Sequence, residues 1–190
     1  MRDKQIDISE LQAELEKLHV ASFGWALSCC RRDRAEAEEV LQTVYLKILE
    51  GRARYRGESS LKTWLFAVIR KTAISEQRKQ LFRSLKSISG SKPDQNTFAT
   101  EPAAAFEKSE SRKQFQKALE RLPARQREVL HLVFYEDLSL RAASNVMGVS
   151  IGSARQHYER GKQHLREWLK REEPDYAISW GRKENPGVVS

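Results

Sequence analysis

The sequence predicts an all-α fold of two small helical domains joined by a flexible linker. Apolar residues recur at steps of three and four over most of the chain, which is the spacing of an amphipathic helix. Residues 84–111 lack that spacing and are rich in Ser, Gly, Pro and other residues that favour loops. We therefore expect a first domain at residues 8–83, a second at 112–171 and a disordered tail at 172–190.

The first domain is expected to contain three helices that share one core. Leucine and aromatic residues at helical spacing predict a helix over residues 9–30. Asp33 followed by Glu36 is typical of a capping box and predicts the start of a second helix, which Gly51 ends. The apolar face of this second helix carries Ala37, Val40, Leu41, Val44, Tyr45, Ile48 and Leu49.

A basic loop at residues 51–60 leads to the third helix of this domain. Ser60 is a favourable N-cap residue because its hydroxyl can accept a hydrogen bond from a free backbone N–H. The helix is expected to run to about Phe82. Its apolar side carries Leu61, Trp64, Leu65, Val68, Ile69 and Thr72.

The second domain has the pattern of a helix-turn-helix at residues 138–165. Pro123 suits the first turn of a helix that precedes this motif. Within the motif, Ser139 caps a short helix, Gly148 makes the turn and Ser150 caps the last helix. The inward stripe of the last helix is expected to carry Ile151, Ala154, Tyr158, Gly161, Leu165 and Trp168.

Composition excludes several classes of protein. No apolar run approaches the roughly 18 residues of a membrane-spanning helix, so no membrane insertion is expected. The polar start of the chain does not resemble a signal peptide, which predicts a cytoplasmic location. Cys29 and Cys30 are adjacent and form no disulfide scaffold. With His19 they could contribute to a zinc or redox site, but no second Cys pair stands at ligand spacing. We therefore expect no cofactor and no catalytic site.

The positive charge is concentrated in two blocks. The chain of 190 residues has a net charge of +8, and residues 52–86 hold ten basic and two acidic side chains. Residues 121–171 hold ten basic and five acidic side chains. The first block interleaves cations with aromatic residues, which suits phosphates and unpaired bases. In the second block, Arg155 and Gln156 can read guanine and adenine in a major groove. The sequence therefore predicts two contacts with DNA.

Two features allow more than one interpretation. Trp64 has the spacing of a core residue, yet its ring could equally stack on a base. An acidic and polar stripe is expected on the outer face of the second helix, where it fits either a solvated surface or a site for a basic protein partner. The stripe consists of Glu36, Glu38, Glu39 and Gln42.

Taken together, these segments resemble an extracytoplasmic-function sigma factor of bacterial RNA polymerase. Residues 36–42 resemble the acidic motif of sigma region 2.2, and residues 64–70 resemble the helix of regions 2.3 and 2.4. Residues 119–127 resemble the entry to region 4, and the helix-turn-helix resembles region 4.2. The resemblance implies a factor that binds core polymerase, recognises the −35 and −10 promoter elements and promotes DNA melting. The resemblance also implies that the protein catalyses no reaction itself.

The resemblance assigns one set of residues to each partner. The set for the clamp of the largest polymerase subunit is Glu36, Glu38, Glu39 and Gln42. The set for the −10 element is Arg54, Tyr55, Arg56, Lys62, Trp64, Arg70, Lys71, Arg78 and Lys79. The set for the −35 element is Arg127, Arg141, Ser150, Ser153, Arg155, Gln156, His157 and Arg160. The flap of the second-largest subunit and an anti-sigma factor are further implied partners.

Two other functions remain open at this point. A self-sufficient helix-turn-helix regulator would dimerise and bind a palindromic operator without polymerase. An adaptor protein would use its basic faces only to stay in solution. The acidic helix next to a basic, aromatic helix favours the sigma factor over both.

Overall fold

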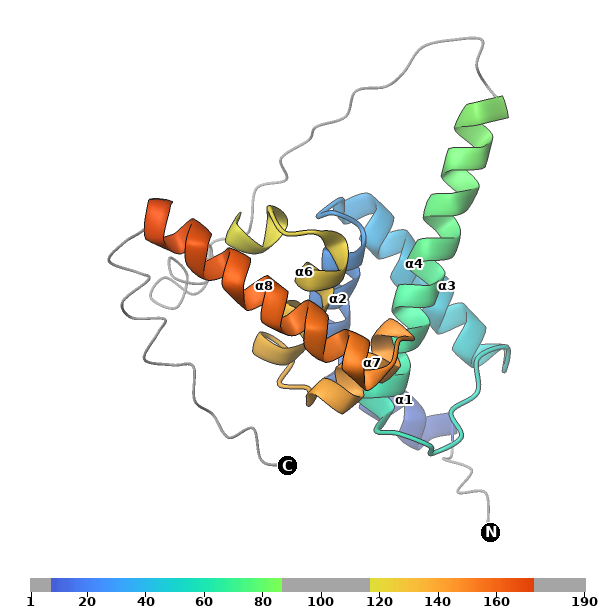
Figure 1. The fold of residues 1–190 in the computed structure, drawn as a ribbon. Coiled ribbons are helices and arrows are strands. Elements are labelled where there is room, and N and C mark those ends of the chain that lie inside the picture. The colour runs from blue at the N-terminus through green and yellow to red at the C-terminus, as the bar shows by residue number, and fades with distance from the viewer. Residues whose placement is uncertain (1–7, 87–116, 173–190) are drawn as a thin grey trace, which may run out of the picture.

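The computed structural model describes residues 8–86 and 117–172, and within these ranges the regular structure is helical throughout. Most of the predicted linker and tail lies outside the described residues. The helices are α1 (Ile8–Lys17), α2 (His19–Cys29), α3 (Arg34–Leu49), α4 (Leu61–Lys86), α6 (Ala124–Phe134), α7 (Leu140–Met147) and α8 (Ile151–Glu172). Figure 1 shows α8 on one side and α3 and α4 on the other. The all-α, two-domain prediction is confirmed.

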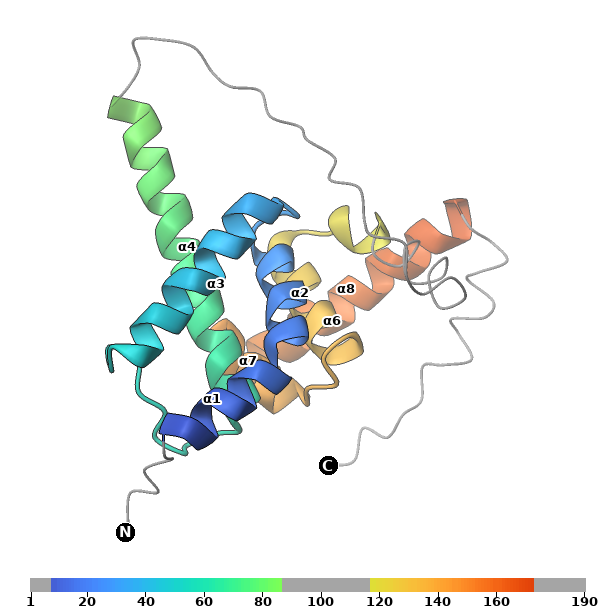
Figure 2. The same ribbon diagram turned by 180° about the vertical axis from the view of Figure 1, so that it is seen from behind.

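The predicted helix at 9–30 is wrong in one respect, because the chain forms two helices there. The break falls at Leu18, and Figure 2 shows α1 leaving α2 at an angle. Leu15 and Trp25, on either side of the break, are 9% and 0% exposed, so both reach the core. Apolar spacing continues through Leu18, which is why the pattern did not indicate the break.

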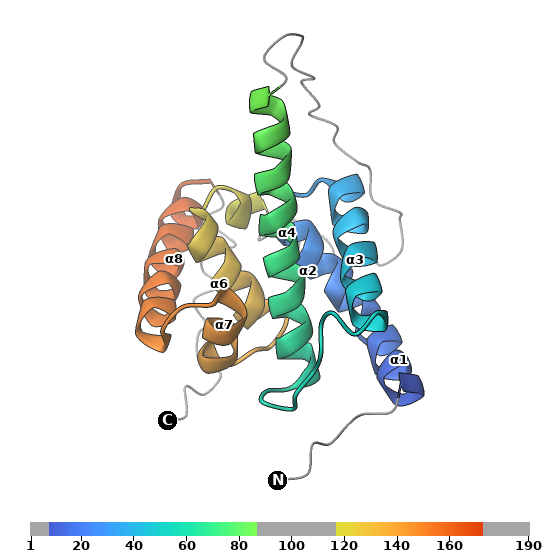
Figure 3. The ribbon, with the colours of Figure 1, turned by 90° about the vertical axis from the view of Figure 1, so that its right-hand side faces the viewer.

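Helix α4 is the central element of the fold. It packs against α2 and α3 of its own domain and against α7 of the second domain, as Figure 3 shows. The Trp25 indole N–H donates a hydrogen bond of 3.0 Å to the Phe66 backbone oxygen, which fixes α2 on α4. The cap at Ser60 is confirmed, since the Thr63 N–H donates to its hydroxyl over 3.2 Å. The helix then continues to Lys86, beyond its predicted end.

The caps predicted for the other helices are confirmed as well. Asp33 accepts from the Glu36 N–H over 2.9 Å at the start of α3, and Ser139 accepts from the Ala142 N–H over 3.2 Å at the start of α7. Gly148 ends α7 with φ of +63°, a left-handed conformation that lets the chain turn sharply into α8.

Close packing of α8 on α6 depends on a residue without a side chain. A Cβ at Gly161 would lie 3.0 Å from Leu130 Cδ1, so the two helices approach more closely there than any larger residue would allow.

Two predicted core residues lie outside the core. Leu49 at the end of α3 is 68% exposed and Ile151 at the start of α8 is 39% exposed, because each stands at a helix terminus past the neighbouring helices.

The two domains are packed against each other. Trp25 of α2 and His131 of α6 place their ring centroids 5.3 Å apart across the boundary. Buried residues from both sides, among them Phe66 and Met147, belong to one continuous apolar cluster. We call this arrangement, in which α4 packs on α7, the closed arrangement. It brings together charged groups that are far apart in the sequence.

The turn of the helix-turn-helix supplies a first prediction. Replacing Gly148 with Ala should lower the free energy of unfolding by about 1–2 kcal/mol, because an L-residue with a Cβ is strained in the left-handed region. Gly24→Ala is the matched control, since Gly24 lies in α2 with no atom within 4 Å of an added Cβ. Urea denaturation followed by circular dichroism measures both. A Gly148→Ala variant as stable as the parent chain would contradict this role for the turn.

Candidate nucleic-acid interface

The exposed start of α8 is the most complete candidate site. Its first turn is held by the Ser153 N–H, which donates to the Ser150 hydroxyl over 3.1 Å, and the two hydroxyls lie 2.9 Å apart. Arg155, Gln156 and Arg160 are exposed, whereas Ala154 is fully buried inside the second domain. The helix therefore presents cationic and amide groups on one face while its other face fixes it to α6 and α7. This is the geometry that reading a major groove requires.

The remaining members of the predicted −35 set differ in their availability. Arg141 is exposed on α7, and His157 is half-buried on α8. Arg127 is half-buried on α6, where its guanidinium donates to the Glu120 backbone oxygen over 3.4 Å. Arg127 therefore contributes to holding the turn before α6.

The loop at 51–60 is organised by an aromatic pair. The rings of Tyr55 and Trp64 lie 5.5 Å apart with an interplanar angle of 56°, and the Tyr55 hydroxyl donates to the Ser59 backbone oxygen. Arg54 donates to the Gly51 backbone oxygen over 3.1 Å, while Arg56 is exposed. Trp64 is half-buried, which agrees with the core interpretation, and its stacking on a base stays a prediction. It packs on the core and also supports the loop.

The cations predicted for the −10 element do not form one surface. Lys71, Arg78 and Lys79 are exposed on α4, and Lys79 pairs with Glu76 over 2.8 Å. Lys62 and Arg70 of α4 face the second domain instead. The cations predicted for the −10 element on α4 therefore differ in their exposure in this arrangement.

Lys62 and Arg70 pair with carboxylates of α6 and the segment after it. Lys62 Nζ lies 3.0 Å from Glu136 Oε2 and donates to the Glu136 backbone oxygen over 2.8 Å. Arg70 is only 8% exposed, and its Nε lies 3.2 Å from Glu128 Oε1. Sequence reasoning missed both carboxylates, because no local pattern indicates that residues more than 50 positions apart will meet.

The acidic stripe of α3 is also partly corrected. Glu38, Glu39 and Gln42 are exposed, and Glu38 pairs with Arg34 over 2.9 Å. Glu36 is half-buried, and burial raises the pKa of its carboxyl above the ordinary value. Glu36 therefore does not lie on the outer face, because its place in the first turn of α3 directs it toward the body of the domain.

A hollow between α2 and α3 borders the exposed part of this stripe. It has a volume of about 380 Å³, and sequence reasoning missed it because its walls come from two helices. Its lining consists of His19, Phe23, Arg34, Glu38, Leu41, Gln42 and Tyr45.

The two cysteines lack the properties of a reactive or metal-binding pair. Burial raises the pKa of the Cys29 thiol well above its usual range and the pKa of the Cys30 thiol to about 12. Both thiols are therefore protonated near neutral pH and are poor nucleophiles. Within the described ranges, no cluster of His, Cys, Asp and Glu side chains could hold a metal ion. None of the described helices is long and apolar enough to cross a membrane.

Comparison with known families gives matches to both domains. Residues 16–83 match the family described as Sigma-70 region 2, and residues 118–167 match Sigma-70, region 4. The ECF RNA polymerase sigma factor SigX of Bacillus subtilis is 28% identical over 164 residues, which cover 83% of this chain and 84% of SigX. The ECF RNA polymerase sigma factor EcfG of Rhodopseudomonas palustris is 29% identical over 131 residues, which cover 68% of each chain.

Solved structures share the fold. The sigma factor RpoE of Bartonella quintana, in complex with the anti-sigma factor NepR, superposes with a TM-score of 0.68 at 24% identity. The match covers 86% of this chain and 98% of that one. CnrH, in complex with the cytosolic domain of CnrY, gives a TM-score of 0.58 at 15% identity, over 88% of this chain and 92% of CnrH.

The contact between the domains should depend on pH through Glu136. Burial would raise the pKa of this carboxyl, but the neighbouring His131 ring and the paired Lys62 ammonium outweigh it, so the pKa lies below the ordinary value of 4.5. A carboxyl with a lowered pKa stabilises the folded state above its unfolded pKa, and this contribution is lost as pH falls through the folded pKa. Glu136→Gln should therefore lower the melting temperature near neutral pH.

The difference between the Glu136→Gln variant and the parent chain should shrink to nothing once pH falls well below 4.5. Thermal melts from about pH 7 to about pH 3 measure this difference, and comparing the two chains removes the effect of all other carboxyls. A difference that stays constant over this range would show that the charge of Glu136 does not contribute.

Proposed function

Because the chain belongs to the extracytoplasmic-function sigma factors of bacterial RNA polymerase, we propose that three separate exposed surfaces carry its three contacts. A sigma factor of this family binds core polymerase, recognises the −35 and −10 elements and promotes melting for transcription initiation. The membership favours this function over a self-sufficient regulator or an adaptor. The single observation that carries the assignment is the exposed, capped start of α8 on a domain that matches region 4.

The proposed core-polymerase surface is the outer face of α3 with the hollow beside it. Glu38, Glu39 and Gln42 are exposed there, and Phe23 and Tyr45 provide an apolar floor next to them. Glu38 and Gln42 line this hollow together with Arg34, which pairs with Glu38, and Glu39 lies beside them on α3. Exposed acidic and polar groups next to an apolar hollow suit a basic partner helix that carries an apolar side chain. This surface lies away from the second domain, so it is exposed while the two domains are packed together.

The proposed −35 surface is the start of α8. Arg155 and Gln156 stand in the first two turns, where side chains of a recognition helix reach base edges. Arg160 and Arg141 are placed to neutralise phosphates on either side. Ser150 and Ser153 serve chiefly as the cap that orients this helix.

The proposed −10 surface combines the 51–60 loop with α4. The Tyr55–Trp64 pair shapes the loop, so unpaired bases would meet a preformed site with aromatic walls. Lys71, Arg78 and Lys79 would hold the phosphates of the separated strands. Holding those strands offsets the free energy needed to unpair the bases.

Further properties follow from the family. We propose that the chain has no enzymatic activity, because polymerase performs the chemistry, and that it acts in the cytoplasm where polymerase is found. Two solved neighbours are complexes, one with the anti-sigma factor NepR and one with the cytosolic domain of CnrY. They support an anti-sigma factor as a further partner of this chain.

Reconstitution tests this function directly. The purified chain is added to sigma-free core polymerase, and transcripts from a library of promoters are sequenced. Initiation at a common −35 and −10 pair is the expected result. If core polymerase with the chain initiates at no more sites than core polymerase alone, the proposed function is wrong.

Reversal of the acidic face should weaken binding to core polymerase. Glu39→Lys with Gln42→Ala replaces attraction by repulsion toward a basic partner, and we expect at least a tenfold loss of affinity, about 1.4 kcal/mol. Both side chains are exposed, so helicity should not change. The matched control is Glu16→Lys with Gln12→Ala, an exposed pair on α1. Equal affinities of both variants in a pull-down with core polymerase would remove α3 from the docking surface.

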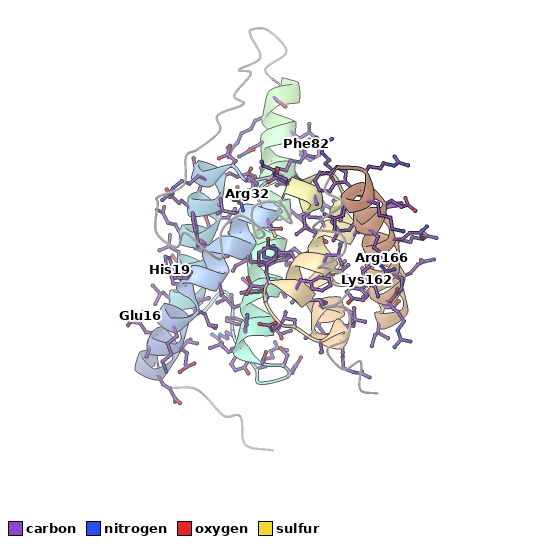
Figure 4. The ribbon with its side chains drawn as sticks, turned by 90° about the vertical axis from the view of Figure 1, so that its left-hand side faces the viewer. Glu16, His19, Arg32, Phe82, Lys162 and Arg166 are labelled. Atoms are coloured by element: carbon purple, nitrogen blue, oxygen red, sulfur yellow. The ribbon has the colours of Figure 1, made fainter. Side chains whose placement is uncertain are left out.

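The base-reading role of Arg155 has a distinct signature. Arg155→Ala should cost about 1–3 kcal/mol and relax preference at one base pair of the −35 element. Arg166→Ala is the control, because Arg166 stands on α8 three turns further along and Figure 4 shows it far from the helix start. Transcription from a series of −35 promoter variants is measured with the Arg155→Ala and Arg166→Ala proteins. A uniform loss over all variants would assign Arg155 to phosphate instead of a base.

A further inference from the structure

The C-terminal end of α4 projects beyond the rest of the molecule. Figures 1 and 3 show this end standing clear of the other helices. Every residue from Arg78 to Ser84 is exposed, whereas Ile69 and Ala73, earlier in the same helix, are buried in the core. Helices in proteins owe most of their stability to the packing of an apolar face. The projecting end, residues 78–84, packs on little of the described part of the chain.

Two large apolar side chains nevertheless lie on this end. Leu81 is 60% exposed and Phe82 is 66% exposed, and Figure 4 labels Phe82 on the projecting part of the helix. Apolar side chains of this size are stabilised when a partner removes them from water. The projecting end therefore has the features of a contact surface.

The charge of this end indicates the chemistry of its partner. Residues 71–86 hold five basic side chains and one acidic side chain. The acidic side chain, Glu76, pairs with Lys79 over 2.8 Å. Arg78 and Arg83 are exposed on the projecting end. Cations next to an aromatic ring suit a nucleic acid, because cations neutralise phosphates and the ring packs on bases or sugars.

The same surface continues the DNA contact proposed for the earlier part of α4. Lys71, Arg78 and Phe82 stand at steps of seven and four residues, so they lie on one face of the helix. Lys71 and Arg78 belong to the proposed −10 surface, and both are exposed. Gln80 stands on the opposite face, about two and a half turns after Lys71. DNA that lies along Lys71 and Arg78 therefore meets Phe82 as well.

The length of α4 separates this end from the unpaired bases of the −10 element. Phe82 stands 18 residues after Trp64, so at ~1.5 Å per residue the two positions are roughly 27 Å apart along the helix. This distance corresponds to about eight base pairs at ~3.4 Å each. The bases proposed to lie at Trp64 are therefore not those at Phe82. Because the chain continues from the end of α4 to the −35-binding domain, this end is expected on the −35 side.

We propose that the projecting end of α4 is a further DNA contact, in which Arg78, Phe82 and Arg83 hold duplex DNA between the −10 and −35 elements. This inference rests on the proposed function, because it takes α4 to lie along the −10 element. Residues 78–84 span roughly 9 Å, so the contact covers about three base pairs. Contacts to phosphates fix the position of a protein on a duplex. This contact anchors the paired DNA next to the bases that are separated.

Substitutions on and off this face test the contact. Phe82→Ala with Arg83→Ala removes the ring and one cation, and Gln80→Ala is the matched control on the opposite face of the same helix end. All three residues are exposed and alanine favours a helix, so circular dichroism should show no loss of helicity. Each protein is assembled with core polymerase on a promoter identified by the reconstitution. Hydroxyl-radical footprints and promoter affinities over a range of salt concentrations are then measured.

The parent holoenzyme and the Gln80→Ala control should protect about three base pairs on the −35 side of the −10 element, and the double variant should lose this protection. Its promoter affinity should fall about three- to tenfold, as for one lost hydrogen-bonded contact. The slope of log affinity against log salt concentration should become shallower by about 0.9, the value for one phosphate contact on duplex DNA.

Neutral methylphosphonate linkages at those base pairs provide a second measurement. They should weaken promoter binding by the parent holoenzyme and leave binding by the double variant unchanged, because the two changes remove the same interaction. Equal footprints for parent and double variant, or equal sensitivity of both to the neutral linkages, would overturn the contact.

The remaining outcomes separate this inference from the proposed function. If the double variant binds core polymerase more weakly in the absence of DNA, Phe82 and Arg83 contact protein and the inference is overturned. Protection on the other side of the −10 element would overturn the assigned position. If the parent chain supports no promoter-specific initiation, the proposed function itself is wrong. Normal initiation together with equal footprints of parent and double variant overturns only the contact between the elements.

Discussion

The buried guanidinium of Arg70 is the constraint around which the two domains are arranged. The side chain leaves α4 at a point where helices from both domains meet, and Glu128 supplies the balancing charge over 3.2 Å. Lys62 repeats the arrangement two turns earlier with Glu136. Because an unpaired buried charge is costly, the packing of the two domains along this face of α4 depends on the carboxylate that pairs with Arg70.

Helix α4 therefore belongs both to the core of the first domain and to the contact between the two domains. Trp25 fixes α2 on α4 from one side, and its ring also meets His131 of the second domain. The core of the first domain is therefore continuous with the contact between the two domains. The start of α8 and the outer face of α3 are exposed while the two domains are packed together, so the contacts proposed there do not require the domains to separate.

The parts of the fold that depend on neighbours in sequence were predictable, and those that depend on distant neighbours were not. Ser139 and Ser150 cap their helices through bonds to residues three positions away, which a short pattern reveals. Lys62 and Glu136 are 74 positions apart, and no local pattern indicates that they meet. The same reason explains the wrong prediction for Glu36. Helical spacing alone placed this residue on the outer face, whereas its side chain is partly buried against the domain.

The central claim is that the free chain is closed and that engagement of polymerase and promoter opens it. It is tested most directly by the distance between spin labels at two exposed positions, Ala13 on α1 and Gln163 on α8, in a chain whose two cysteines are replaced by alanine. The account predicts a short, narrow distance distribution for the free chain and a longer one for the chain in a promoter complex with core polymerase. A free chain with the same long distance as the promoter complex would contradict it.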